Sequence, residues 1–441
     1  MVKPIVQLYP VIHSDSEEDR IARRPLGRDS AAYQETLKGM NEIVVGLDEL
    51  GFWGVTAIEH HFWSEGYQIG PCPGIYNAHW ASITKNINVG QLGYVMSTQS
   101  PIRVAEEIAV LDHLAQGRVF AGFARGYQSR WTNILGQLTG ARATKSPNAI
   151  NEGKGSFNFT TGAKTASADA AQMQADDDRN RRIFEESVNL VIKAWTCESI
   201  ELDGEFWKIP FPYDTGVDDW QPAHSGITAR MGARGEVDEN NAIRQVSVVP
   251  SPYTAPHPPV FVGVSGSPQS IEYAALNDFN VGYFTSVARA LAMGKIYVDT
   301  SAAQGRTRAM GQNQALIRWM MIGDTEADAR EKLVRHDGEI FKNMYAGMSP
   351  QIMSNPNDLA ESMMGTGLWI TGSVSQVRDH FISHWKEFPA DYCILVSHYA
   401  QISAEEQLAQ YKIFMEEIKP ALDELAPDRD PEAEADAELV R

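Results

Sequence analysis

The stretch INVGQLGYVMSTQSPIRVAEEIAVLDHLAQGRVFAGFARG, residues 87–126, has the pattern of a strand, a helix and a second strand in succession. Short β-branched and apolar runs flank a segment whose apolar residues recur at helical spacing. Ser100 and Pro101 suit the N-cap and first turn of this helix, and Gly117 suits its end. The apolar face of the predicted helix consists of Val104, Ile108, Leu111 and Ala115. The stretch therefore predicts one strand–helix–strand unit of an α/β protein.

The same alternation extends over the rest of the chain. Eight apolar or β-branched runs are expected to be strands, and helical segments separate them. The predicted strands are 5–12, 52–60, 87–97, 119–126, 259–266, 281–286, 315–323 and 392–399. Eight strands in strict alternation with helices predict a single (β/α)8 TIM barrel, with a doubly wound open sheet as the alternative.

Two regions interrupt this rhythm. Insertions at 139–178 and 213–244 follow the fourth strand, and a methionine-rich segment at 344–367 follows the seventh helix. Each either closes over an active site as a lid or decorates the surface. We expect one barrel domain over residues 1–425 and an acidic, disordered tail over 426–441.

Composition excludes several classes of partner. The 441 residues carry a formal net charge of −19, which disfavours nucleic acid and anionic membrane surfaces. No apolar run approaches the roughly 20 residues that span a bilayer, and no signal peptide is expected. The three cysteines, Cys72, Cys197 and Cys393, form no CxxC pair, which disfavours a disulfide framework or a thiolate zinc site and suits a cytoplasmic protein.

The segment AIEHHFWSEG, residues 57–66, places Glu59, His60 and His61 at the end of a predicted strand. Neighbouring residues on a strand point to opposite faces, so the two imidazoles are not expected to bind one metal ion. We expect no metal site. A proton-handling role for His60 suits imidazole, which titrates near neutrality. The alternative is that these side chains only satisfy backbone carbonyls at the barrel rim.

Two further segments suit a phosphate group. In VFVGVSGSPQSIEYAA a strand leads into a helix whose first turn presents Ser267, Ser270 and free backbone N–H groups. Arg125 ends another strand, and its guanidinium can bind phosphate through two parallel bonds. An ordinary helix cap and a structural salt bridge are the alternatives. Together the two features favour a phosphorylated cofactor, although no Walker or Rossmann glycine motif is present.

Three blocks of the sequence resemble the bacterial luciferase-like flavin-dependent monooxygenase family. They are GFWGVTAIEHHF, NINVGQLGYVMSTQSPIRVAEEIAVLDHLAQGR and FAGFARGYQSRWTNILG, all between residues 51 and 136, and PPVFVGVSGSPQSIEYAA adds weaker support. The resemblance implies a (β/α)8 barrel that binds reduced FMN (FMNH2). It assigns His60 to the reaction of the flavin with oxygen and Arg125, Ser267 and Ser270 to the flavin phosphate.

The resemblance also predicts a non-proline cis peptide under the flavin ring, at the matching pair Leu92–Gly93. The chain departs from luciferase at two positions. Ala124 replaces a reactive cysteine, and Gly266, in the predicted phosphate loop, replaces a glutamate. Light emission from a long-chain aldehyde is therefore not implied.

The function that follows is the FMN-dependent oxygenase component of a two-component monooxygenase. A separate NAD(P)H:flavin reductase would supply reduced FMN, and O2 would oxygenate a small, largely apolar substrate. The family also implies a homodimer. The expected substrate pocket consists of Phe62, Trp63, Tyr94, Tyr127, Met363 and Met364. The alternatives are a deazaflavin-dependent hydride-transfer enzyme of the same superfamily and a non-catalytic flavin-binding barrel.

Overall fold

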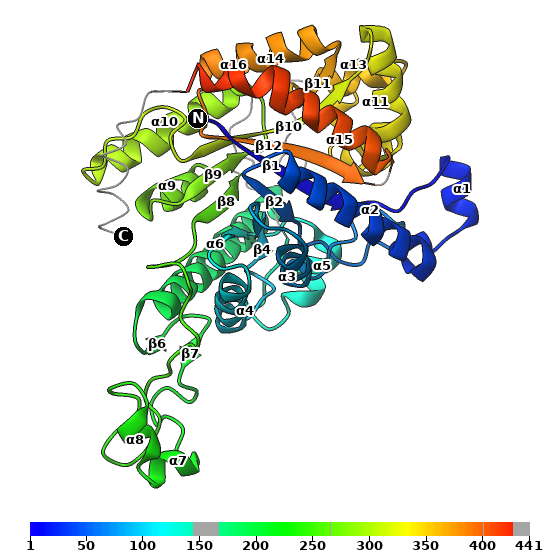
Figure 1. Ribbon diagram of the computed structural model, residues 1–441. Coiled ribbons are helices and arrows are strands. Elements are labelled where there is room, and N and C mark those ends of the chain that lie inside the picture. The colour runs from blue at the N-terminus through cyan, green and yellow to red at the C-terminus, as the bar shows by residue number, and fades with distance from the viewer. Residues whose placement is uncertain (144–166, 265, 400, 427–441) are drawn as a thin grey trace.

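Eight parallel strands close into a barrel in the computed structural model, which describes residues 1–143, 167–264, 266–399 and 401–426 (Figure 1). The barrel strands are β1 (Lys3–Pro10), β2 (Gly54–Ala57), β3 (Asn88–Gln91), β5 (Val119–Ala124), β8 (Val260–Val264), β9 (Asn280–Tyr283), β10 (Gln314–Ile322) and β12 (Tyr392–Tyr399). Closure is complete because β12 pairs with both β1 and β10, and β10 also pairs with β9. The predicted (β/α)8 barrel is confirmed, and each predicted strand overlaps one barrel strand.

Two short strands add to the barrel sheet. β4 (Tyr94–Val95) pairs with β5, and β11 (Trp369–Gly372) pairs with β10. The single strand predicted over 87–97 is therefore divided into β3 and β4 at Leu92–Gly93, whose peptide bond is cis as expected. Gly93 lies so close to β5 that an added β-carbon would come within 2.5 Å of the Gly122 backbone. Only glycine fits this approach of the two strands.

Helices cover the outside of the barrel (Figure 1). The longer ones are α2 (Ser30–Glu49), α3 (Pro73–Ile83), α4 (Pro101–Leu114), α9 (Pro268–Leu276), α10 (Val287–Ala303), α11 (Glu326–Ile340), α14 (Val374–Glu387) and α15 (Ala404–Ile413). Asp29 caps α2 and Ser373 caps α14 through side-chain bonds to backbone N–H groups. Ser100 and Ser267 occupy the N-cap positions of α4 and α9 as expected, but neither hydroxyl makes a capping bond.

Shorter helical segments complete the connections. They are α1 (Glu17–Ala22), η1 (Leu26–Arg28), α5 (Ser129–Leu135), η2 (Phe341–Tyr345), α12 (Ala346–Met348), η3 (Pro350–Ile352), α13 (Leu359–Met364), η4 (Phe414–Ile418) and α16 (Lys419–Asp423). Within the described ranges, no helix is both long enough and apolar enough to cross a bilayer.

Aromatic side chains fill one end of the barrel interior. Trp53, Phe120, Phe261 and Tyr392 lie at or just before the starts of their strands. Their ring centroids lie 5.0–5.3 Å apart around this cluster. The amino-terminal end of the barrel is therefore closed, and open space remains at the carboxyl ends of the strands, where (β/α)8 barrels carry their sites.

The insertions differ in their relation to the barrel. After β5 come α6 (Ser167–Thr196), the antiparallel pair β6 (Leu202–Asp203) and β7 (Lys208–Ile209), and then α7 (Gln221–His224) and α8 (Ile227–Met231). The predicted insertion 213–244 contains α7 and α8 and projects away from the barrel (Figure 1). Much of the predicted insertion 139–178, residues 144–166, lies outside the described residues, as does the predicted tail after residue 426.

Candidate active site

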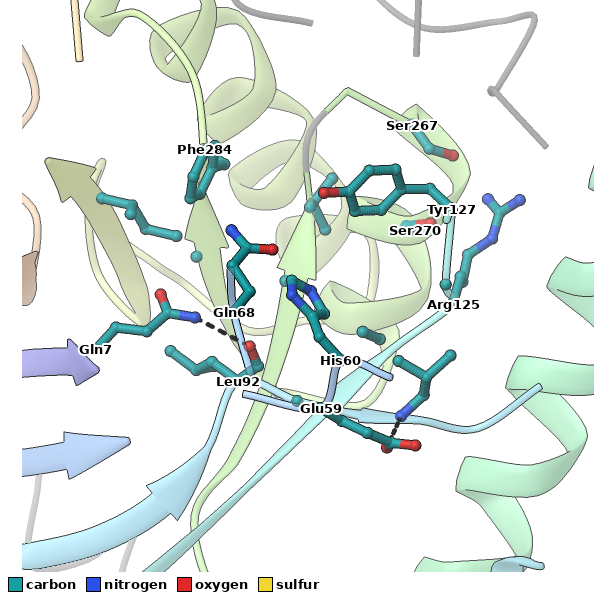
Figure 2. Close-up of a pocket in the computed structure, with 18 of the residues that line it drawn as sticks. Gln7, Glu59, His60, Gln68, Leu92, Arg125, Tyr127, Ser267, Ser270 and Phe284 are labelled. Atoms are coloured by element: carbon teal, nitrogen blue, oxygen red, sulfur yellow. Dashed lines mark hydrogen bonds between the residues drawn. The ribbon is translucent and has the colours of Figure 1, made fainter. Parts of the chain in front are cut away.

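A cavity of ≈ 190 Å³ opens at the carboxyl ends of the barrel strands. Seven of the barrel strands, or the segments directly after them, contribute lining residues. The cavity brings together His60, Arg125, Ser267 and Ser270, which the sequence places far apart (Figure 2). The Leu92–Gly93 pair also lines it, whereas Gly266 does not.

In the Glu59–His60–His61 segment, Glu59 and His60 both line the cavity, whereas His61 does not. The buried Glu59 carboxylate accepts bonds from Val95 N at 2.7 Å, Gln99 Nε2 at 2.7 Å and His61 Nε2 at 3.0 Å. Glu59 and His61 therefore fix the loop after β2, while His60 lines the cavity beside them (Figure 2). The two imidazoles diverge, as the strand alternation predicted. Among the described residues, no group of three or more histidine, cysteine, aspartate or glutamate side chains is arranged to hold a metal ion.

Gln128 determines which nitrogen of His60 carries the proton. The Gln128 Oε1 accepts bonds from Trp63 Nε1 at 3.2 Å and Trp131 Nε1 at 3.1 Å, which fixes the orientation of the amide. Its Nε2 therefore donates to His60 Nε2 at 3.4 Å. The proton of a neutral His60 then resides on Nδ1, which is buried and makes no hydrogen bond of ordinary geometry, although the Gln68 side chain lies close enough to affect the ring. An unpartnered donor at the cavity is suited to a ligand oxygen.

Burial sets the charge of His60. Desolvation lowers the pKa of the imidazole from 6.5 to about 4; the Gln68 side chain opposes this shift and the neighbouring His61 adds to it. The expectation that His60 titrates near neutrality is corrected by this burial, which the sequence does not reveal. With this lowered pKa, His60 is neutral at pH 7.

Arg125, Ser267 and Ser270 form the other side of the cavity (Figure 2). Arg125 follows β5, and the serines lie at the start of α9, where backbone N–H groups also lack intrahelical partners. The guanidinium forms an ion pair with Asp177 of α6, yet its buried Nε has no partner. A cation and two hydroxyls at one helix terminus are suited to a phosphate group.

Open space lies beside one barrel strand of the cavity. A β-carbon added at Gly263 on β8 would meet nothing within 4 Å, so space is open beside that strand. The orphaned Arg125 Nε and His60 Nδ1 lie at two sides of the same cavity. The described volume is below the roughly 300–1,000 Å³ of a typical ligand pocket. A flavin phosphate at Arg125 would also replace the Asp177 carboxylate.

Most of the expected substrate-pocket residues lie elsewhere. Tyr127 lines the cavity. The other five do not: Phe62 is 49% exposed, Trp63 binds Gln128, the buried Tyr94 donates to Glu107, Met363 is buried in the core, and Met364 contacts Arg330. The methionine-rich segment instead contributes Tyr345 to the cavity, and the first insertion contributes Asp177. The sequence analysis missed two further residues: Gln68, which lines the cavity just after the segment 57–66, and Gln128, which contacts His60 and lies within the quoted block 120–136.

Residues 22–147 match the family model described as luciferase-like monooxygenase, which confirms the resemblance noted in the sequence. Over 91 residues the chain is 32% identical to the alkanal monooxygenase beta chain of Photorhabdus luminescens. This match covers 21% of the present chain and spans only 28% of that relative.

Solved structures share the fold over nearly the whole chain. The oxygenating constituent of 3,6-diketocamphane monooxygenase from Pseudomonas putida, a type II Baeyer–Villiger monooxygenase in complex with FMN, has a TM-score of 0.66 at 15% identity, covering 95% of this chain and 98% of that one. An F420-dependent secondary alcohol dehydrogenase has a TM-score of 0.55 at 12% identity, covering 98% and 100%. At these identities the similarity establishes the barrel fold alone.

Proposed function

We propose that this chain, whose residues 22–147 belong to the luciferase-like monooxygenase family, is the oxygenase component of a two-component monooxygenase. It would use O2 and reduced FMN to oxygenate a small, largely apolar organic substrate. The observation that carries the proposal is one cavity with Arg125, Ser267 and Ser270 at one side and the buried His60 at another. A separate NAD(P)H:flavin reductase would supply the reduced FMN.

The phosphate end would be held by this chain's own charges. Arg125 would donate charge-assisted bonds to the phosphate, and the Ser267 and Ser270 hydroxyls would add neutral ones. The Arg125 Nε, which has no partner in the structure, would gain one. These contacts would hold one end of the cofactor and leave its ring on the His60 side of the cavity.

His60 and the side chains of the barrel interior would contact the flavin ring. Reduced FMN, when bound, supplies the two electrons that activate O2. His60 would donate its Nδ1–H to an oxygen atom at the ring, and its burial keeps the imidazole neutral for that role. Apolar and aromatic lining residues such as Leu92, Phe284 and Ile317 would exclude water from the reaction.

A deazaflavin-dependent hydride transfer is the second candidate, and the shared fold of an F420-dependent alcohol dehydrogenase favours keeping it. Anaerobic titration of the purified protein with reduced FMN and with reduced F420 separates the two. We expect reduced FMN to bind more tightly. Tighter binding of F420, with hydride transfer to or from an alcohol, would replace the oxygenase assignment.

Oxygenation itself is tested with a flavin reductase, NADH, FMN and ¹⁸O2. Small apolar ketones, aldehydes, thioethers and phenols serve as the substrate panel, and catalase removes peroxide formed without substrate. We expect at least one compound to accelerate O2 consumption and to gain one ¹⁸O atom by mass spectrometry. FMN binding without ¹⁸O incorporation into any compound would favour a non-catalytic flavin-binding barrel.

A further inference from the structure

We propose that Asp337, His398 and Tyr345 form a proton relay through the barrel wall, in which Tyr345 exchanges a proton with a hydroxyl-bearing substrate in the cavity. These three residues are called the relay below. The proposal rests on the proposed function in placing the substrate in this cavity, and it adds an acid–base group distinct from His60.

The relay joins three separate elements through two hydrogen bonds. The hydroxyl oxygen of Tyr345, at the end of η2, lies 2.8 Å from Nε2 of His398 on β12. Nδ1 of His398 lies 3.0 Å from Oδ1 of Asp337 on α11. The other carboxylate oxygen accepts a bond from Trp369 Nε1 at 3.2 Å. Tyr345, His398 and Asp337 are 1%, 3% and 7% exposed, so water competes little for these bonds.

The direction of each bond follows from its chemistry. A carboxylate can only accept, so Nδ1 of His398 carries the ring proton and Nε2 is an acceptor. The Tyr345 hydroxyl must therefore donate to His398. On the cavity side, the phenolic oxygen of Tyr345 can accept hydrogen bonds. It accepts one from Gln68 Nε2 at 3.4 Å. Such an oxygen is suited to a substrate O–H group.

Several titratable groups face the relay from the elements packed against it. The Tyr9 ring of β1 lies 5.6 Å from the His398 ring, while Tyr127 faces Tyr345. Tyr411 faces Asp337 from α15, and beyond it the His336 side chain lies 3.9 Å from Glu406. Burial chiefly, with smaller contributions from Tyr9, Tyr127 and Asp337, raises the pKa of Tyr345 well above its usual value. The phenol therefore retains its proton at rest.

Gln68 connects the relay to the His60 side of the cavity. Its amide donates to the Tyr345 hydroxyl. The same side chain lies beside the His60 ring (Figure 2). Gln68 is 1% exposed and has a φ of +44°, a strained backbone conformation for a residue with a side chain. Strain of this kind is retained where the surrounding structure requires one side-chain position. Gln68 therefore holds the cavity end of the relay in place.

A second, small cavity lies at the outer end of the relay. It measures ≈ 30 Å³, and its lining includes both Asp337 and His398 together with polar side chains of β12 and α15, Ser397, Gln407 and Gln410. That volume is large enough for a water molecule, and the lining supplies several hydrogen-bond partners. The relay therefore extends from the reaction cavity to a second, water-sized cavity that several polar side chains line together with apolar ones.

The proton step balances without a further reactant. The O–H bond of the substrate breaks and its proton bonds to the Tyr345 oxygen, while the Tyr345 proton passes to Nε2 of His398. His398 becomes an imidazolium whose charge Asp337 offsets, and the substrate retains the electron pair as an oxyanion. Reversal of the same movements returns a proton to the product. A positioned phenolic or enolic hydroxyl is the substrate group that this step requires.

Nuclear magnetic resonance of the cofactor-free, full-length protein tests the relay without turnover. The protein is labelled with ¹⁵N-histidine, and His398→Gln identifies the ring signals of His398. We expect a single tautomer with the proton on Nδ1. Asp337→Asn should abolish this single tautomer, and Tyr345→Phe should move the Nε2 signal toward that of an unbonded ring nitrogen. If His398→Gln does not fold, the one histidine that responds to both other variants gives the assignment.

Tyr67→Phe is the matched control, because Tyr67 is a buried tyrosine that donates to Glu339 on the same helix as Asp337 but lies outside the relay. It should leave every His398 signal unchanged. A proton on Nε2 in the unaltered protein, or no histidine that responds to both Asp337→Asn and Tyr345→Phe, would overturn the relay.

Kinetics test whether the relay serves the reaction. Tyr345→Phe should lower kcat by roughly 100-fold, the scale of general acid–base catalysis, while Kd for reduced FMN stays within about twofold. Asp337→Asn should also lower kcat, because an amide offsets the charge of an imidazolium less than a carboxylate does. Unchanged kcat in both variants would overturn the catalytic role. If the unaltered protein oxygenates no compound, the proposed function is contradicted. The magnetic resonance experiment still tests the relay, because it does not depend on turnover.

Discussion

His60 and Arg125 illustrate how burial changes what a side chain does. Both lie at the ends of strands, as polar residues often do, but each has a buried nitrogen without a hydrogen-bond partner. Unsatisfied buried donors reduce the stability of the protein alone and strengthen binding of a ligand that accepts from them. At the residue scale, these two nitrogens are the strongest indication that the cavity is a binding site.

The pH dependence of stability should report the burial of His60. The pKa of His60 is 6.5 in the unfolded chain and about 4 in the folded protein. Between these pH values the unfolded state therefore binds more protons than the folded state. The free energy of unfolding therefore falls as the pH falls through this window. When the pH is lowered from 7 to 5, the free energy of unfolding should decrease by about 2 kcal/mol less in His60→Gln than in the unaltered protein. Urea unfolding measures this difference. Identical pH dependence in the two proteins would show that His60 is solvated.

Truncation of Arg125, the proposed phosphate-binding residue, should weaken cofactor binding. Arg125→Ala removes a charge-assisted bond, so Kd for reduced FMN should rise by roughly 10–100-fold, or about 1.5–3 kcal/mol. Arg182→Ala, which removes an exposed arginine paired with Glu205 on the surface, is the control and should not change it. Equal affinity in Arg125→Ala and the unaltered protein would remove Arg125 from the site.

At the scale of elements, α6 joins the first insertion to the cavity. Its Asp177 side chain binds the guanidinium that a phosphate would need. A helix from an inserted segment therefore supplies a carboxylate that would compete with the proposed cofactor for Arg125. Cofactor binding and the position of α6 should be coupled for this reason.

Neutralising that competitor should strengthen binding. Asp177→Asn keeps the shape of the side chain and removes its charge, so Kd for reduced FMN should fall by about 3–10-fold in an anaerobic titration. Asp178→Asn, which alters the adjacent aspartate paired with Arg181, is the matched control and should leave Kd unchanged. Weaker binding in Asp177→Asn would mean that the carboxylate positions Arg125 for the phosphate.

For the molecule as a whole, the sequence predicted those features that follow from local sequence patterns. Strand–helix alternation predicted the eight barrel strands, and the motif around residues 87–126 predicted the cis bond at Leu92–Gly93 through the family resemblance. The cavity residues His60, Arg125, Ser267 and Ser270 were predicted because each ends a strand or begins a helix. The domain limits, a homodimer and a partner reductase stay predictions.

What the sequence did not predict depends on contacts between distant residues. Asp177 lies 52 positions from Arg125, and Tyr345 lies 53 positions from His398, so no spacing rule relates them. The methionine-rich segment was expected to line the pocket with Met363 and Met364, but α13 places Met363 in the core, and η2 contributes Tyr345 instead. The low pKa of His60 likewise follows from burial, which only the folded chain determines.

The central claim is that the cavity binds a flavin by its phosphate and so directs the ring toward His60. Anaerobic titration of the unaltered protein with reduced FMN and with reduced riboflavin, which lacks the phosphate, tests it most directly. We expect reduced riboflavin to bind roughly 10–100-fold more weakly than reduced FMN, and Arg125→Ala to remove most of that difference. Equal affinity for the two flavins, or no binding of reduced FMN, would contradict the claim.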